Sequence, residues 1–136
     1  MKHLKFTFVF TLLLLLLFSL CACGGKTLSL PLRSVELSTY GEPLNGNSRV
    51  PDATITVKEN LHDGDEVTLD YSGHRYHGTI GSRYVIWDED PNLLDGGTLM
   101  YTTISIRDQV VTLEFSFSYG VSSGDASIDM VQTFYE

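Results

Sequence analysis

The chain has 136 residues, 43% of them hydrophobic, and a formal net charge of −8 at pH 7. A chain of this length can build one hydrophobic core but not two, and its apolar content excludes disorder for most of the sequence. Because no cluster of lysine and arginine interrupts the acidic balance, nucleic acid is excluded as a partner.

The first 22 residues have the pattern of a secretion signal. A short basic segment with Lys2 and Lys5 precedes an apolar run from Phe6 to Leu20, which is too short for a comfortable membrane-spanning helix. The run ends in Leu20-Cys21-Ala22-Cys23, where a small residue stands directly before the second cysteine. This pattern resembles the lipobox of bacterial lipoproteins. The resemblance implies that Cys23 receives a diacylglycerol and that the peptide bond before it is cut.

The resemblance divides the chain into a signal peptide (1–22), a lipidated linker (23–27) and a single β domain (28–136). Removal of the signal leaves seven of the nine basic residues and all 17 acidic ones, a net charge of −10. Cys23 would then be the one remaining cysteine, so no disulfide within the domain is expected. The acyl chains would hold the protein at a membrane, since each buried methylene contributes about 0.8 kcal/mol.

Residue 24 bears on the compartment in a cell with two membranes. In the lipoprotein family, an aspartate after the modified cysteine is associated with retention at the inner membrane, and this chain has Gly24 there. The resemblance therefore implies a lipid-anchored protein of the bacterial cell envelope, at the outer membrane and facing the periplasm.

After the linker, apolar and polar residues alternate with a period of two, interrupted by glycine, asparagine, aspartate and proline. This pattern predicts an all-β domain of antiparallel strands. The predicted strands are Arg33–Thr39, Ala53–Lys58, Glu66–Tyr71, Arg75–Ile80, Tyr84–Asp88, Leu99–Arg107, Val110–Tyr119 and Ala126–Tyr135. The predicted loops are Tyr40–Pro51, Asp88–Gly97 and Gly120–Gly124.

The three middle strands are predicted to form a meander with one apolar face. A turn over Ser72–Arg75 would place His77 opposite Asp70, and a second turn at Gly81-Ser82 would continue the meander. The apolar face would carry Val67, Leu69, Tyr71, Tyr76, Ile80, Val85 and Trp87.

A second sheet is predicted from a hairpin that turns at Asp108-Gln109. Its register would align the apolar faces of both strands, with Met100 opposite Phe117 as the last pair. In the meander, Gly78 would leave a gap that we expect Trp87 to fill. Two sheets with one apolar face each close on one another, so the fold is expected to be an antiparallel sandwich or a small barrel of about eight strands.

The predicted pairing of Asp70 with His77 is the strongest candidate for catalysis. A carboxylate can orient an imidazole for general-base work. However, no serine stands in a nucleophile context such as Gly-x-Ser-x-Gly. We therefore interpret the pair as a solvent-exposed cross-strand contact and expect no catalytic residue and no enzymatic activity.

Two groups of residues suggest metal binding, both weakly. His74 and His77 are spaced for one face of a helix, but on a strand they would point in unrelated directions. An acidic loop echoes the start of a calcium-binding loop, yet it has leucine where that loop needs its glycine and its closing glutamate. Neither metal nor cofactor is expected, and the weak candidates in the loop are Asp88, Asp90, Asn92 and Asp95.

The outer face of the sheet carries an unusual set of residues for a polar surface: Asp70, His77, Tyr84, Ile86 and Tyr101. Either these residues contact a protein partner or a loop or sheet edge covers them. The first interpretation predicts a non-enzymatic protein-binding or assembly module, an inhibitor or immunity protein being one version, with a basic partner. The alternative prediction is a β-barrel that carries a small apolar ligand or lipid.

Overall fold

The structure is a computed structural model, and it describes residues 25–45, 49–121 and 124–136. The predicted signal peptide and Cys23 lie outside the described residues. Within the described ranges, no helix has the length and apolar character needed to cross a membrane. The strands are β1 (Thr27–Thr39), β2 (Glu42–Pro43), β3 (Ala53–Lys58), β4 (Glu66–Tyr71), β5 (His74–Gly81), β6 (Tyr84–Trp87), β7 (Thr98–Arg107), β8 (Val110–Val121) and β9 (Gly124–Phe134).

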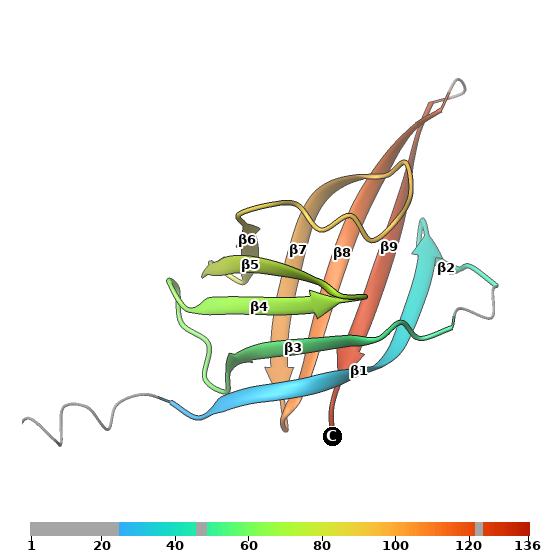
Figure 1. Cartoon of the computed structure of the whole chain (residues 1–136). Helices are drawn as coiled ribbons and strands as arrows, with labels where there is room; N and C mark the ends of the chain where they lie inside the picture. The colour runs from blue at the N-terminus through green and yellow to red at the C-terminus, as the bar shows by residue number, and fades with distance from the viewer. Residues whose placement is uncertain (1–24, 46–48, 122–123) are drawn as a thin grey trace, which may run out of the picture.

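Eight of these strands form a closed antiparallel barrel. The order around the barrel is β1-β3-β4-β5-β6-β7-β8-β9, and pairing of β1 with β9 closes it, while the short β2 pairs only with the end of β1. Figure 1 shows β3, β4 and β5 running crosswise in front of β7, β8 and β9. Of the two architectures that the sequence left open, the chain therefore adopts the barrel.

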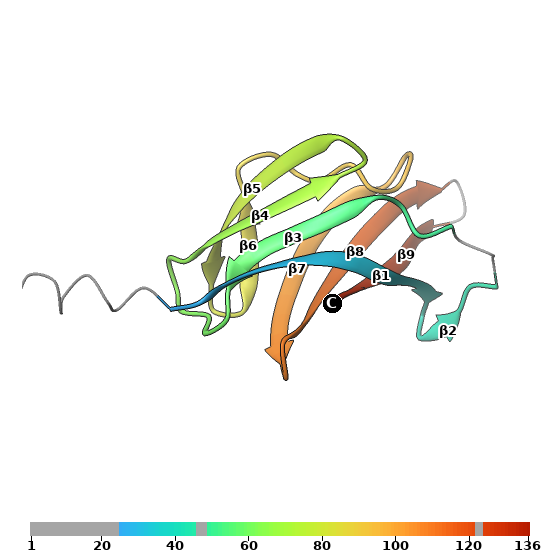
Figure 2. The ribbon, with the colours of Figure 1, turned by 60° about the horizontal axis from the view of Figure 1, so that its bottom comes forward.

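Strand β1 closes the barrel because it pairs with β3 and also with β9. Its first part, Thr27–Pro31, pairs with β3, and its second part, Leu32–Ser38, pairs with β9 (Figure 2). The register shifts between Leu32 and Ser34, and such a bulge bends a strand. β1 begins six residues before the predicted strand and takes in Thr27 of the predicted linker.

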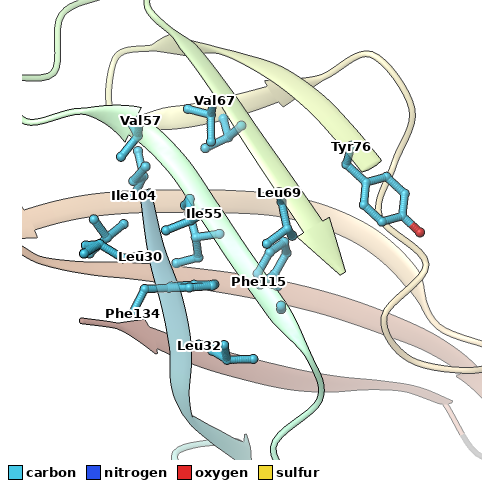
Figure 3. Close-up of a cluster of buried hydrophobic side chains, with 14 of the residues drawn as sticks. Leu30, Leu32, Ile55, Val57, Val67, Leu69, Tyr76, Ile104, Phe115 and Phe134 are labelled. Atoms are coloured by element: carbon cyan, nitrogen blue, oxygen red, sulfur yellow. The ribbon is translucent and has the colours of Figure 1, made fainter. Parts of the chain in front are cut away.

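The side chains that point into the barrel form one continuous core. Those from β1, β3 and β4 point toward Phe115 and Phe134 on the opposite strands (Figure 3). Phe115 stacks on Trp87 at 6.3 Å and on Phe117 at 6.2 Å between ring centroids. The buried hydrophobic residues are Leu28, Leu30, Leu32, Ala53, Ile55, Val57, Val67, Leu69, Tyr76, Ile80, Val85, Ile104, Val111, Leu113, Phe115, Phe117, Met130 and Phe134.

The register of the β7–β8 hairpin agrees with the prediction near its turn. Asp108 and Gln109 form the turn with φ angles of 51° and 61°, which suit the right-handed twist of a hairpin. At the far end the prediction is wrong. A register shift between Leu99 and Tyr101 places Leu99 opposite Phe117, so Met100 is exposed instead of pointing inward.

In the meander, the predicted faces are correct but the predicted partners are wrong by two residues. Asp70 pairs with Arg75, and His77 pairs with Thr68. The cause is turn length, because Ser72 and Gly73 alone form the first turn with positive φ angles. A shift of two residues keeps every side chain on its face, so the core residues are unaffected.

The prediction of the second turn is wrong by one position, because Ser82 and Arg83 form it with positive φ angles, and Gly78 therefore lies opposite Trp87. The Trp87 ring fills the space in front of Gly78, as predicted. A Cβ on Gly78 would lie 2.6 Å from Val85 Cγ1 and 3.0 Å from Trp87 Cε3. We expect Gly78→Ala to lower the free energy of unfolding by about 1 to 3 kcal/mol because the core would be overpacked.

Urea denaturation of the Gly78→Ala variant measures this loss. The matched control is Gly120→Ala, since an added Cβ at Gly120 meets nothing within 4 Å. Equal stabilities of the two variants would contradict the close packing of Trp87 on Gly78.

Candidate docking face

The junction between β6 and β7 is the least paired part of the barrel wall. Only Tyr84 and Thr103 form a strand pair there, supplemented by a hydrogen bond of 3.1 Å from the Ile104 amide to the Arg83 carbonyl. By contrast, β7 pairs with β8 along its whole length. Since β6 has four residues and β7 has ten, most of β7 has no strand partner on this side.

Four large apolar side chains are exposed over this junction, and we call them the seam patch. The exposed fractions are 49% for Tyr84, 64% for Ile86, 62% for Met100 and 45% for Tyr101. The rings of Tyr84 and Tyr101 meet edge to face at 6.1 Å between centroids. The alternative that a loop or sheet edge covers these aromatic residues is therefore wrong.

Carboxylates surround the seam patch on the outer surface. Following the strand pairs outward, Glu114 lies two strands from Tyr84 and Glu66 lies two strands from Ile86. Asp129 lies two strands from Tyr101 and accepts a hydrogen bond of 2.8 Å from Ser116. Since neighbouring strands are about 4.8 Å apart, these carboxylates stand about 10 Å from the patch.

Asp70 and His77 share this outer surface but do not form the predicted pair. Arg75 donates two hydrogen bonds to Asp70, at 2.7 and 3.1 Å, and these lower the pKa of the carboxyl group below its ordinary value. His77 Nδ1 lies 3.3 Å from the Thr68 hydroxyl instead. The predicted orientation of an imidazole by Asp70 is therefore wrong, because the register brings a guanidinium to that carboxylate.

The loop from Asp88 to Gly97 covers one end of the barrel. Pro91 is buried and Leu93 and Leu94 pack against the core. The four residues considered for calcium, Asp88, Asp90, Asn92 and Asp95, are all exposed. Among the residues that the structure describes, no group of three or more histidine, cysteine, aspartate or glutamate side chains is placed to hold a metal ion.

The opposite end of the barrel carries a groove of about 740 Å³ that sequence reasoning missed. It lies between the β3–β4 loop and the last residues of β7, next to the turn that precedes β6, and we call it the rim groove. No sequence motif marks it, because its walls come together only when the barrel closes. Its lining residues are Glu59, Asn60, Leu61, His62, Arg83, Ile104, Ser105 and Ile106.

The seam patch offers contact area and tyrosine hydroxyl groups, surrounded by acceptors. Three of the five predicted partner-face residues, Tyr84, Ile86 and Tyr101, lie together in it, whereas Asp70 and His77 lie on β4 and β5. No protein-family model, curated protein or solved structure matches the chain.

Proposed function

We propose that this chain is a lipid-anchored, non-enzymatic binding protein of the bacterial cell envelope, and that it docks a protein partner on the seam patch. One observation carries the docking proposal: of the eight large apolar residues exposed in the described part of the chain, four lie on the neighbouring strands β6 and β7, namely Tyr84, Ile86, Met100 and Tyr101, and the rings of Tyr84 and Tyr101 meet. Single exposed apolar residues are ordinary, but a contiguous group rimmed by polar residues marks an interaction site. The anchor rests on the lipobox resemblance at Cys23.

The charge around the patch favours a basic partner. Glu66, Glu114 and Asp129 surround the patch, and one basic side chain, Arg83, stands in the turn that precedes β6. The chain without its signal has a net charge of −10. A basic partner would be attracted at a distance and would place its own cations opposite these carboxylates, which speeds encounter and selects against acidic proteins.

The alternative proposal, a carrier of an apolar ligand, shares the closed-barrel architecture. Its difficulty is the packed interior. Ile55, Leu69, Leu113 and Phe115 have no accessible surface, so no space of the size of a water molecule adjoins them. A lipid released from the natively purified protein on denaturation would favour the carrier over the docking protein.

The docking proposal is tested by placing a photocrosslinking side chain at Ile86 in living cells. We expect a discrete crosslinked product, and we expect Tyr84→Ser combined with Tyr101→Ser to reduce its yield roughly tenfold, since aromatic residues at the centre of an interface contribute most of its binding energy. The free energy of unfolding should be almost unchanged, because both rings are half exposed.

The matched control places the crosslinker at Tyr135, another exposed tyrosine, which lies at the end of β9 beside Arg33. The yield at Ile86 should also fall as salt is raised, because the rim attraction is screened. Equal yields at the two positions, or a yield at Ile86 that the double substitution leaves intact, would remove the proposed docking site.

A further inference from the structure

The chain enters the barrel at the end that carries the rim groove. β1 begins at Thr27, which pairs with Lys58, and the Glu59 amide donates a hydrogen bond of 2.8 Å to the Lys26 carbonyl. In Figure 1 the start of β1 lies beside the loop that joins β3 to β4. We define the anchor rim as this loop with the two hairpin turns at the same end: Glu59–Asp65, Ser82-Arg83 and Asp108-Gln109.

The anchor rim is the part of the barrel that Cys23 can reach. Lys26 is the third residue after Cys23, and an extended chain spans at most about 3.6 Å per residue, which gives about 11 Å. Strand β7 alone, with ten residues, is about 34 Å long. A lipid on Cys23 therefore holds this rim near the bilayer and holds the Asp88–Gly97 loop at the opposite end away from it.

The charges at the two ends of the barrel also favour the anchor rim as the end nearer the bilayer. The anchor rim together with the residues that flank it carries charges of both signs: Lys26, Lys58, Arg83 and Arg107 against Glu59, Asp63, Asp65, Glu66 and Asp108. Lys58 is bonded to Asp65 at 3.0 Å. The cations include two exposed arginines, Arg83 in the rim and Arg107 directly before its last turn. The Asp88–Gly97 loop holds four carboxylates and neither lysine nor arginine. Anionic lipid headgroups repel such a loop and accept the mixed rim.

We propose that the anchor rim is a membrane-contact surface that lies against the phospholipid headgroups. The barrel then stands on the bilayer with the rim groove open toward it, the Asp88–Gly97 loop at the free end, and the seam patch on the side wall, accessible to a partner. This inference rests on the proposed lipid anchor, because the position of Cys23 selects the rim.

The test is fluorescence quenching of the full acylated protein in phospholipid vesicles that contain lipids with a nitroxide on the headgroup. Acylation blocks the Cys23 thiol, and Cys21 leaves with the signal, so an introduced cysteine is the one site for the fluorophore. Asn60→Cys, within the anchor rim, and Arg107→Cys, directly before its Asp108-Gln109 turn, report on the rim, and Asp90→Cys is the matched control on the opposite loop. All three positions are exposed.

We expect both rim labels to be quenched severalfold more strongly than the label at position 90. Arg107 is essential to the design because its hairpin does not pair with β1. Quenching at position 60 alone would mean that the barrel hangs from its tether, and similar quenching at all three positions would mean that it has no fixed orientation. Either result overturns the membrane-contact surface while leaving the anchor intact. Protein that fails to float with the vesicles would overturn the anchor as well.

Discussion

The Phe115→Ala variant is expected to lose about 3 to 5 kcal/mol of unfolding free energy, the usual cost of removing a fully buried phenylalanine. Phe115 has no accessible surface and stacks on both Trp87 and Phe117. Strand β8 is paired with β7 on one side of Phe115 and with β9 on the other, so the backbone around this residue cannot easily move into the cavity. In a small domain whose total stability is about 5 to 15 kcal/mol, such a loss is large.

Equilibrium unfolding in urea, followed by the fluorescence of Trp87, measures the loss at Phe115. The matched control is Glu114→Ala on the same strand, where the side chain points outward and is exposed. We expect that control to stay within about 0.5 kcal/mol of the natural chain. A Phe115→Ala variant as stable as the control would contradict a packed barrel interior and would reopen the carrier proposal.

The second large effect is a gain in stability, expected when Gln132 is replaced by an apolar residue. Gln132 is fully buried on β9 and points into the core between Met130 and Phe134 on the same face. Its amide nitrogen lies 3.3 Å from the Met130 sulfur, and its Oε1 has no hydrogen-bond partner among the residues that the structure describes. Because an unsatisfied buried polar group costs about 1 to 3 kcal/mol, Gln132→Leu should raise the unfolding free energy by about that amount.

The same urea experiment tests the gain at Gln132. Thr133→Val, which changes a half-buried residue one position along β9, controls for a general effect of added apolar surface and should change little. Gln132→Glu should destabilise the fold strongly at neutral pH, because it buries a charge without a partner. If Gln132→Leu were instead less stable than the natural chain, its oxygen would have to be hydrogen-bonded in solution.

The sequence predicted which face each strand buries better than it predicted which residues pair. Alternation placed Val67, Leu69 and Val85 in the core correctly, because a face depends only on odd or even position. Pairing also depends on how many residues each turn takes. The turn at Asp108-Gln109 was predicted correctly, whereas the turn at Ser72-Gly73 takes two residues fewer than expected.

The candidate site was predicted in part, because alternation along a strand shows which side chains point outward. Tyr84, Ile86 and Tyr101 followed from alternation, since they occupy outward positions. Met100 did not, because the bulge beside it reverses its direction. The early start of β1 had a signal in the alternation of Leu28, Leu30 and Leu32, which are buried, although Pro31 between them argues against a strand.

The features that depend on closure of the barrel are not marked by any short stretch of the sequence. The rim groove arises where the β3–β4 loop meets β7. The seam patch arises where β6 and β7 meet, and these strands share a single residue pair. The side of β7 that faces β6 therefore could not be derived from hairpin registers, which specify neighbours along the chain. Closure through β1 and β9 joins residues about 100 positions apart, beyond the range of any turn argument.

Whether a lipid on Cys23 holds this acidic barrel at a membrane can be read from the mass of the intact protein purified from its native membranes. We expect a chain that begins at Cys23 and carries the added mass of a diacylglycerol. A chain that retains residues 1–22, or one that begins at Cys23 with a free thiol, would contradict the lipid anchor.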